Sequence, residues 1–184
     1  VTTPTVSDPE QENSRNESYN YSEFQSAIKI LVKNNYIVVG DKKYPSTPLL
    51  NKFYQTRKYE LAWFKRNLKP RKELKTYLKT LQNSKAEGLD PNFYYLDSIE
   101  KNIKDLKNLK GNDLKRRVIQ IDLLVSDSSL TYFSELLFGR YKYSTNFIEQ
   151  TYSEPYIDIV TVVNNAIAKN NFQQAVDSLL PYNL

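Results

Sequence analysis

The sequence contains no cysteine, no histidine and no methionine, and only 4 of its 184 residues are glycine. The absence of cysteine excludes disulfides, thiolate nucleophiles and Cys-ligated zinc. The absence of histidine removes the most common general base and the most common imidazole metal ligand. An enzyme built from this chain would have to work with carboxylates, Lys, Tyr, Ser or Thr. We therefore expect no catalytic residue, no metal site and no cofactor.

Long apolar runs are also missing, since no stretch approaches the roughly 20 residues that a membrane-spanning helix needs. Hydrophobic residues still make up 40% of the chain and aromatic residues 13%, which is typical of a globular protein. The 26 basic and 21 acidic residues give a formal charge of +5. The lysines are scattered along the predicted helices, so this surplus indicates a solvated surface.

Residues 1–20 differ in composition from the rest of the chain. They include Pro4, Pro9 and many Ser, Thr, Asn, Asp and Glu, with almost nothing apolar. Such a segment buries too little apolar surface to offset its ordering entropy. We predict a flexible polar tether over 1–20 and a folded domain over 21–184. Because a tether of this kind is common after a removed signal peptide or a lipid anchor, we expect a periplasmic or outer-surface protein.

From Tyr21 onward, apolar residues recur at helical spacing. The first helix is predicted to carry Phe24 and Ile28, with Ser22 and Gln25 spaced as a capping box. Thr47-Pro48 is typical of a helix start. Further helices are predicted over 49–57, 70–81, 97–106, about 156–168 and 171–180. Glycine after a periodic segment indicates a left-handed helix end, and this applies to Gly88, Gly111 and Gly139.

The longest predicted helix runs from about Asn112 to Phe138. It has two apolar stripes, and a helix that is apolar on two sides packs against neighbours on both. The sequence therefore predicts an all-α fold, a compact multi-helix domain around a long central helix. Two short apolar runs, Tyr36–Val39 and Leu61–Phe64, leave room for a very small β fragment.

The central helix carries the best polar candidates, Asp122 and Asp127. Five residues separate them by about 140° around the helix, which argues against a paired-carboxylate acid/base site. We expect Asp122 to be partly buried and satisfied by a cation, Arg57 or Arg140, or by backbone amides, because an unpaired buried carboxylate is too unfavourable to keep. Arg57 is the first choice for its partner. Ser126, Ser128 and Ser129 are expected to be close-packing hydroxyls, since no base is visible beside them.

The chain has 15 tyrosines, and aromatic faces can stack on sugar rings. Most are expected to place their apolar bodies in the core and their hydroxyls at its edge. Tyr94, Tyr95, Tyr141 and Tyr143 fall in predicted loops and are the candidates for ligand contact.

Three segments, taken in order, resemble the scaffold domain of large L,D-transpeptidases. The first matched segment, residues 53–63, has the pattern F-Y-x-x-R-x-Y-x-x-A-W, and the second, residues 87–94, has E-G-L-x-P-x-x-Y. The third, residues 122–127, has D-x-L-x-[ST]-D and is followed by Gly139. The matched residues singled out as structural are Phe53, Tyr54, Arg57, Tyr59, Trp63, Gly88, Leu89, Pro91, Asp122, Asp127 and Gly139. Ser128-Ser129 departs from the small apolar residues that the family often has there.

The resemblance implies an exported protein involved in building 3→3 peptidoglycan cross-links. In such enzymes the nucleophile is a Cys in a catalytic domain that also supplies a His. This chain has neither residue, so no catalytic role is carried over to it. The implied partners are the protein's own catalytic domain and peptidoglycan, and Phe53 and Trp63 are implied to be core anchors.

Two other functions fit the sequence. One is a stand-alone extracytoplasmic module that binds glycans or proteins through its helices. The other is a helical nucleic-acid binder, suggested by Lys115-Arg116-Arg117 at the start of the central helix. That basic cluster is short, so nucleic acid is not an expected partner.

Overall fold

The computed structural model describes residues 20–139 and 157–180. Within them the chain order is α1 (Tyr21–Leu31), β1 (Tyr36–Val39), β2 (Lys42–Pro45), α2 (Leu49–Thr56), α3 (Lys72–Gln82), η1 (Ser84–Glu87), η2 (Pro91–Tyr94), α4 (Leu96–Asp105), η3 (Leu106–Asn108), α5 (Gly111–Phe138), α6 (Ile159–Lys169) and α7 (Phe172–Leu179). The η elements are short 3₁₀ helices. The predicted all-α fold is confirmed, and most predicted helices are found within a few residues of their expected bounds. The predicted tether lies outside the described residues except for Asn20.

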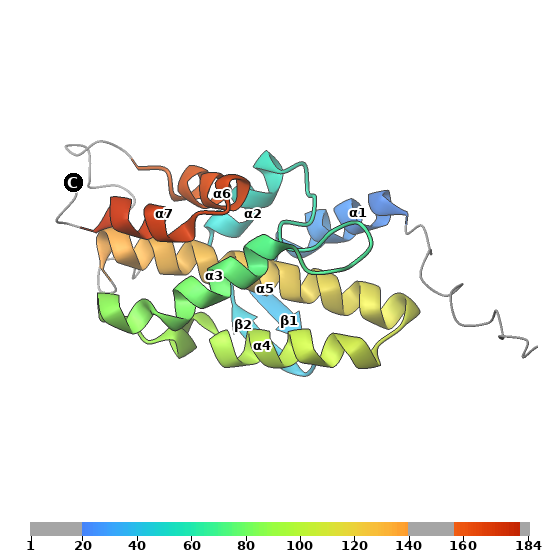
Figure 1. Ribbon diagram of the computed structural model, residues 1–184. Coiled ribbons are helices and arrows are strands. Elements are labelled where there is room, and N and C mark those ends of the chain that lie inside the picture. The colour runs from blue at the N-terminus through green and yellow to red at the C-terminus, as the bar shows by residue number, and fades with distance from the viewer. Residues whose placement is uncertain (1–19, 140–156, 181–184) are drawn as a thin grey trace, which may run out of the picture.

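The 28-residue helix α5 is the centre of the fold. Figure 1 shows it running the length of the described molecule, with α2, α6 and α7 on one side and α4 on the other. It contacts α1, α2, α4, α6, α7 and β1. Every residue from Ile121 to Leu130 is buried, so this part of the helix is enclosed on all sides. The two apolar stripes predicted this enclosure correctly.

Aromatic rings fill the space around α5. Trp63 and Phe53 are both 0% exposed, which confirms their prediction as core anchors. The Trp63 ring lies 5.3 Å from the ring of Tyr77 and 5.8 Å from that of Phe172, measured between centroids. Trp63 therefore joins α3 and α7 to the loop that follows α2.

The small β element differs from the prediction. Tyr36–Val39 is a strand, but its antiparallel partner is Lys42–Pro45 and not Leu61–Phe64. Gly40, at φ 59°, adopts the left-handed conformation that lets the chain turn back at once. In the segment 61–64 only Phe64 forms a bridge, with Pro70, because the backbone N–H groups before it are used elsewhere, as described below.

Two predicted helix ends are also wrong. The cap of α1 is Asn20, whose side chain accepts a hydrogen bond from Ser22 N, so Ser22 and Gln25 do not form a capping box. Gly111 begins α5 and does not end the helix before it. Gly88 and Gly139 do end η1 and α5, at φ 77° and 72°. Among residues 20–139 and 157–180, no helix combines the length and the apolar character needed to cross a membrane.

Candidate functional site: a buried polar network on the central helix

Asp122 lies in the middle of α5 and is 0% exposed. One carboxylate oxygen, Oδ1, accepts hydrogen bonds from the Tyr54 hydroxyl at 2.6 Å and from Ala62 N at 2.9 Å. The other, Oδ2, accepts from Trp63 N at 2.8 Å. The predicted burial of Asp122 and its satisfaction by backbone amides are therefore both observed.

Ser126 lies one helical turn beyond Asp122 and extends the same network. Its Oγ accepts a hydrogen bond from Trp63 Nε1 at 2.9 Å and donates to the Asp122 carbonyl at 2.8 Å. The Tyr54 hydroxyl is 2.8 Å from the same Oγ. The first matched segment is thus joined to the third through five polar contacts centred on two residues of α5.

Asp127 is 2% exposed and points to another part of the molecule. Its Oδ1 accepts a hydrogen bond from Thr47 N at 2.5 Å, just before α2 begins. Burial raises the pKa of Asp127 from 3.8 to about 7, even though the Thr47 N–H group lowers it. The prediction that the two carboxylates do not share a site holds, since they have different partners.

Ser128 connects the second matched segment to α5. Its Oγ donates to the Tyr94 carbonyl at 2.7 Å and lies 2.8 Å from the Tyr77 hydroxyl. Tyr94 closes η2, and Tyr77 belongs to α3. All three matched segments therefore meet on α5, and Ser128 has a specific structural role.

Arg57 does not pair with Asp122, which corrects the sequence-based expectation. Its Nη1 donates to Asn164 Oδ1 at 2.9 Å, and its guanidinium carbon lies 5.4 Å from the centroid of the Phe53 ring. The carboxylate needs no ion pair because three donors already satisfy it. The positive charge of Arg57 still lowers the pKa of Asp122.

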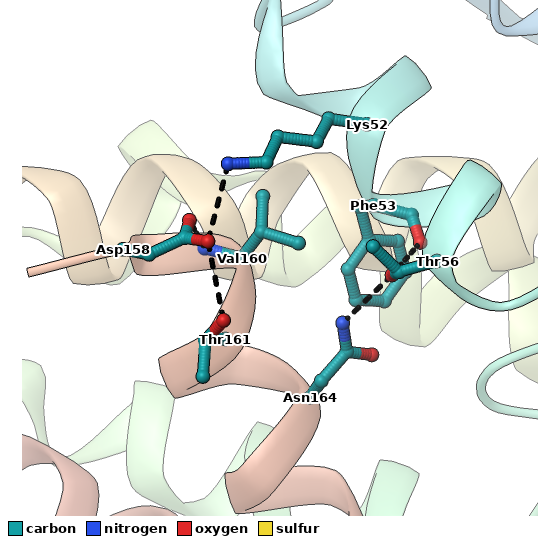
Figure 2. A network of polar contacts seen from close by, with 7 residues as sticks. All are labelled: Lys52, Phe53, Thr56, Asp158, Val160, Thr161 and Asn164. Carbon is teal, nitrogen blue, oxygen red and sulfur yellow. Dashed lines mark hydrogen bonds and ion pairs between the residues drawn. The ribbon is translucent and has the colours of Figure 1, made fainter.

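Asn164 belongs to a second set of contacts, which ties α6 to α2 (Figure 2). Asn164 Nδ2 donates to Thr56 Oγ1 at 3.1 Å. Lys52 Nζ donates to Asp158 Oδ2 at 3.1 Å, and Asp158 caps α6 by accepting from Val160 N at the same distance. Burial raises the pKa of Asp158, but the hydrogen bonds from Lys52 and Thr161 and the charge of Lys52 outweigh it, so the net change is downward.

Opposing effects act on the pKa of Asp122. Burial raises the pKa of Asp122, while the bonds from Tyr54, Ala62 and Trp63 lower it, and the net pKa lies above its ordinary value. Burial and the neighbouring Asp122 charge also raise the pKa of the Tyr54 hydroxyl, so that hydroxyl stays a donor. The network holds chain segments together and presents no group to a substrate.

The remaining predicted residues fall into three groups. Pro91 is buried, whereas Leu89 and Tyr59 are half-buried, so all three contribute to packing. Tyr95 is half-buried and packs edge-on against Tyr44, with ring centroids 4.8 Å apart. Tyr141 and Tyr143 lie outside the described residues.

Tyr94 does not lie in the loop that the sequence predicted, and it is not accessible for ligand contact. It lies in η2, is 1% exposed and donates from its hydroxyl to Glu135 Oε2 at 2.5 Å. Its ring also packs edge-on against Tyr132 of α5, with centroids 5.3 Å apart. The 3₁₀ turn that begins at Pro91 rotates this ring inward, and no periodicity in so short an element signals that direction.

Several partners in these networks were not foreseen from the sequence. Thr47 and Ala62 contribute backbone N–H groups, which no side-chain pattern reveals. Asn164 lies 107 residues from Arg57 in the chain, so its role depends on tertiary structure alone. Within the described ranges, no group of three or more carboxylates is placed to hold a metal ion.

A groove of about 370 Å³ lies apart from these networks, between α1, β1 and the first half of α5. Its walls are mostly apolar and include Phe24, Val38 and Leu123, with Lys115 and Glu23 at its edge. Lys115 Nζ lies 3.3 Å from Glu23 Oε2, so this charge pair bridges α1 and α5. Lys115 and Arg116, the basic residues that suggested a nucleic-acid binder, line the groove, but Tyr94 and Tyr95, candidates for ligand contact, do not.

Comparison with known proteins identifies one family. No curated protein and no solved structure matches the chain. A family model described as "Scaffold domain" matches residues 48–183. The match includes all three matched segments, the helix that joins them and the C-terminal helices. Because it covers well over half of a chain whose matched residues hold the core together, the chain belongs to the scaffold-domain family.

Proposed function

We propose that this chain is the non-catalytic scaffold domain of an exported L,D-transpeptidase that cross-links peptidoglycan. In this role it supports the catalytic domain of the same protein. The proposal assigns the chain to the periplasm or the outer surface of a bacterial cell, with a lipid anchor as one means of attachment.

One observation carries this proposal: the three segments that resemble the transpeptidase scaffold are held together by buried contacts along α5. Tyr54 and Trp63 bond to Asp122, and Tyr94 bonds through its carbonyl to Ser128. Residues that recur in a family for catalysis are expected to face a cleft, whereas these face the core. A rigid support for another domain needs such a core and no reactive group.

The test is the coding sequence that follows the codon for Leu184. A segment with a His and a Ser-x-Gly-Cys-x-Arg stretch in the same frame would support the proposal. A stop codon directly after Leu184 would contradict it. With the longer product in hand, analysis of muropeptides should show 3→3 cross-links made by that product and none made by the 184-residue chain alone.

The alternative is a stand-alone module that binds glycans or proteins. The burial of Tyr94 takes away one of the rings that suggested it. Direct contact with peptidoglycan is compatible with both readings. Sedimentation of the chain with purified sacculi tests that contact, and loss of sedimentation on Tyr95→Ala would favour the alternative.

A further inference from the structure

The highest local net positive charge of this protein lies in one continuous stretch. Residues 65–79, which we call the basic segment, contain seven basic residues and one acidic residue, a net charge of +6. The whole chain has a formal charge of +5, so the rest of the chain is slightly negative. The sequence interpretation of scattered lysines therefore misses a local excess of positive charge in this segment.

The first half of the basic segment is a turn that the backbone holds in place. Lys65 N donates to the Lys69 carbonyl at 2.9 Å, and Leu68, at φ 61°, is buried beneath the turn. Arg71 N donates to the Trp63 carbonyl at 2.9 Å, which fixes the turn to the core. Lys65, Arg66 and Lys69 are exposed on this turn.

The second half is the outer face of α3. Lys72, Lys75 and Lys79 are exposed and fall within about 60° of one another around the helix, along about 10 Å of its axis. The opposite face carries Leu74 and Leu81, which are buried. In Figure 1, α3 crosses in front of α5, on the outside of the helical core.

These charges have almost no partners in the part of the chain that the structure describes. Arg66 lies 4.0 Å from Glu60, and both side chains are largely exposed. Arg71 is half-buried and donates from Nε to the Phe64 carbonyl. None of the five lysines, Lys65, Lys69, Lys72, Lys75 and Lys79, forms an ion pair with a described residue. The basic segment therefore carries positive charge that nearby acidic side chains do not neutralise.

We propose that the basic segment docks the protein on an anionic phospholipid bilayer. At physiological ionic strength, charges more than about 8 Å apart are screened from one another, so a small anion would interact with only one or two of these lysines. An extended anionic surface engages all of them together, and each Lys or Arg near such a surface adds to the attraction.

The residue types in the basic segment favour a bilayer over other polyanions. Lysine is a flexible point charge suited to a diffuse anionic surface, whereas arginine forms the bidentate contacts typical of nucleic-acid recognition. The one exposed arginine of the basic segment, Arg66, already stacks over the Tyr21 ring at 4.5 Å. No large hydrophobic side chain within residues 65–79 is exposed, so the face lacks an aromatic ring for stacking on sugars. This proposal does not depend on the transpeptidase assignment.

The test is co-sedimentation of the full chain with vesicles of phosphatidylcholine alone or with about 30% phosphatidylglycerol. We expect binding to the anionic vesicles only, with strong weakening as salt is raised. The triple substitution Lys72→Glu, Lys75→Glu and Lys79→Glu should lower the partition coefficient about a hundredfold or more. The corresponding triple Lys→Gln variant, which adds no negative charge, should lower it by a smaller factor, and thermal unfolding of both verifies that they fold.

Helix α4 supplies the matched control. Lys101, Lys104 and Lys107 lie on α4 and η3 and are exposed, but three acidic residues in the same stretch balance them. Changing all three to Glu alters the net charge of the chain by the same amount as the α3 variant, and we expect a loss of less than about tenfold. Equal losses for the two triple variants would overturn the proposal, as would absence of wild-type binding. Tighter wild-type binding to duplex DNA or to purified peptidoglycan at equal salt would also overturn it.

Discussion

At the scale of single residues, Asp122 accounts for much of the stability that the matched segments provide. A buried carboxylate without partners is very costly, but hydrogen bonds to a charged group are stronger than those between neutral groups. Tyr54, Ala62 and Trp63 together supply three such bonds. Asp122 can thus order a non-helical loop against α5, which an apolar side chain could not do.

Replacing Asp122 by Asn should therefore destabilise the protein strongly. The amide would turn its NH₂ group towards at least one of the backbone donors, leaving that donor unsatisfied in the core. We expect the free energy of unfolding to fall by about 3 kcal/mol, measured by urea denaturation. Asp97→Asn, at an exposed position in α4, is the control and should change it by less than about 0.5 kcal/mol. Equal effects from the two substitutions would show that the Asp122 contacts contribute little.

Asp127 should make the stability depend on pH. Its pKa is about 7 in the folded protein and near 3.8 when unfolded, so unfolding releases a proton between these values. Stability from this group is complete below about pH 4 and is lost as the pH rises through about 7. The difference between the two pKa values corresponds to at most about 4 kcal/mol.

Asp127→Asn removes this titration and keeps an oxygen for the Thr47 N–H group. We expect the variant to gain stability relative to the wild type by about 1–3 kcal/mol between pH 4.5 and pH 8, measured from thermal unfolding at both values. If the stability difference between variant and wild type is the same at both pH values, Asp127 does not have a raised pKa in the folded protein.

Trp63 combines a packing role with a polar one, and two substitutions separate them. Trp63→Ala should cost about 3–5 kcal/mol because it leaves a large cavity beside Tyr77 and Phe172. Trp63→Phe keeps most of the apolar contact but loses the Nε1 bond to Ser126, and we expect a cost of about 1–2 kcal/mol. If the thermal midpoint is unchanged by Trp63→Ala, the ring is not a core anchor.

Residue-scale prediction from the sequence succeeded for burial and failed for pairing. The position of Asp122 beside an apolar stripe indicated burial correctly. Arg57 was the first choice for its partner, on charge complementarity, but the alternative of backbone amides is the one that the structure shows. Two of the donors to Asp122 are backbone N–H groups, and Arg57 binds Asn164 instead. The sequence around Asp122 and Arg57 identifies neither set of partners.

At the scale of elements, helices were predictable because apolar periodicity and burial are the same property seen in sequence and in space. The two stripes of α5 predicted a helix surrounded by others, and the structure buries ten consecutive residues there. The partner of β1 was missed because Lys42–Pro45 is polar and alternates weakly, whereas Leu61–Phe64 is apolar for another reason, namely that it lies in the core.

The contacts between α2 and α6 predict that one asparagine stabilises the C-terminal helices (Figure 2). Asn164→Leu removes the bonds to Thr56 and Arg57. It leaves the Arg57 guanidinium, whose Nε has no partner among the described residues, without the amide. We expect a loss of about 2 kcal/mol in the free energy of unfolding. We also expect faster amide exchange in α6 and α7.

Asn165→Leu is the matched control, since Asn165 is the next residue in α6 and is exposed. It should leave both the unfolding free energy and the exchange of α6 and α7 nearly unchanged. If Asn165→Leu had the larger effect, the contacts of Asn164 with Thr56 and Arg57 would not be what holds α6 and α7 in place.

At the scale of the whole molecule, the central claim is that segments far apart in the sequence are held on α5 by buried polar contacts. Tyr54 and Trp63 reach Asp122 and Ser126, Thr47 reaches Asp127, and Tyr94 reaches Ser128. In a domain built in this way, these polar contacts fix distant parts of the chain to one buried helix. The order of the three matched segments in the sequence indicated the family, but their convergence on one helix could be learned only from the fold.

Hydrogen exchange at the backbone amides of Ala62 and Trp63 tests this claim most directly. These amides lie in an irregular loop, where exchange is normally fast, yet both donate to the buried carboxylate of Asp122. We predict that they exchange as slowly as the amides of Leu123 and Leu124 in α5, through global unfolding, and that Asp122→Ala makes them exchange much faster. Fast exchange at Ala62 and Trp63 in the wild-type protein would contradict the account.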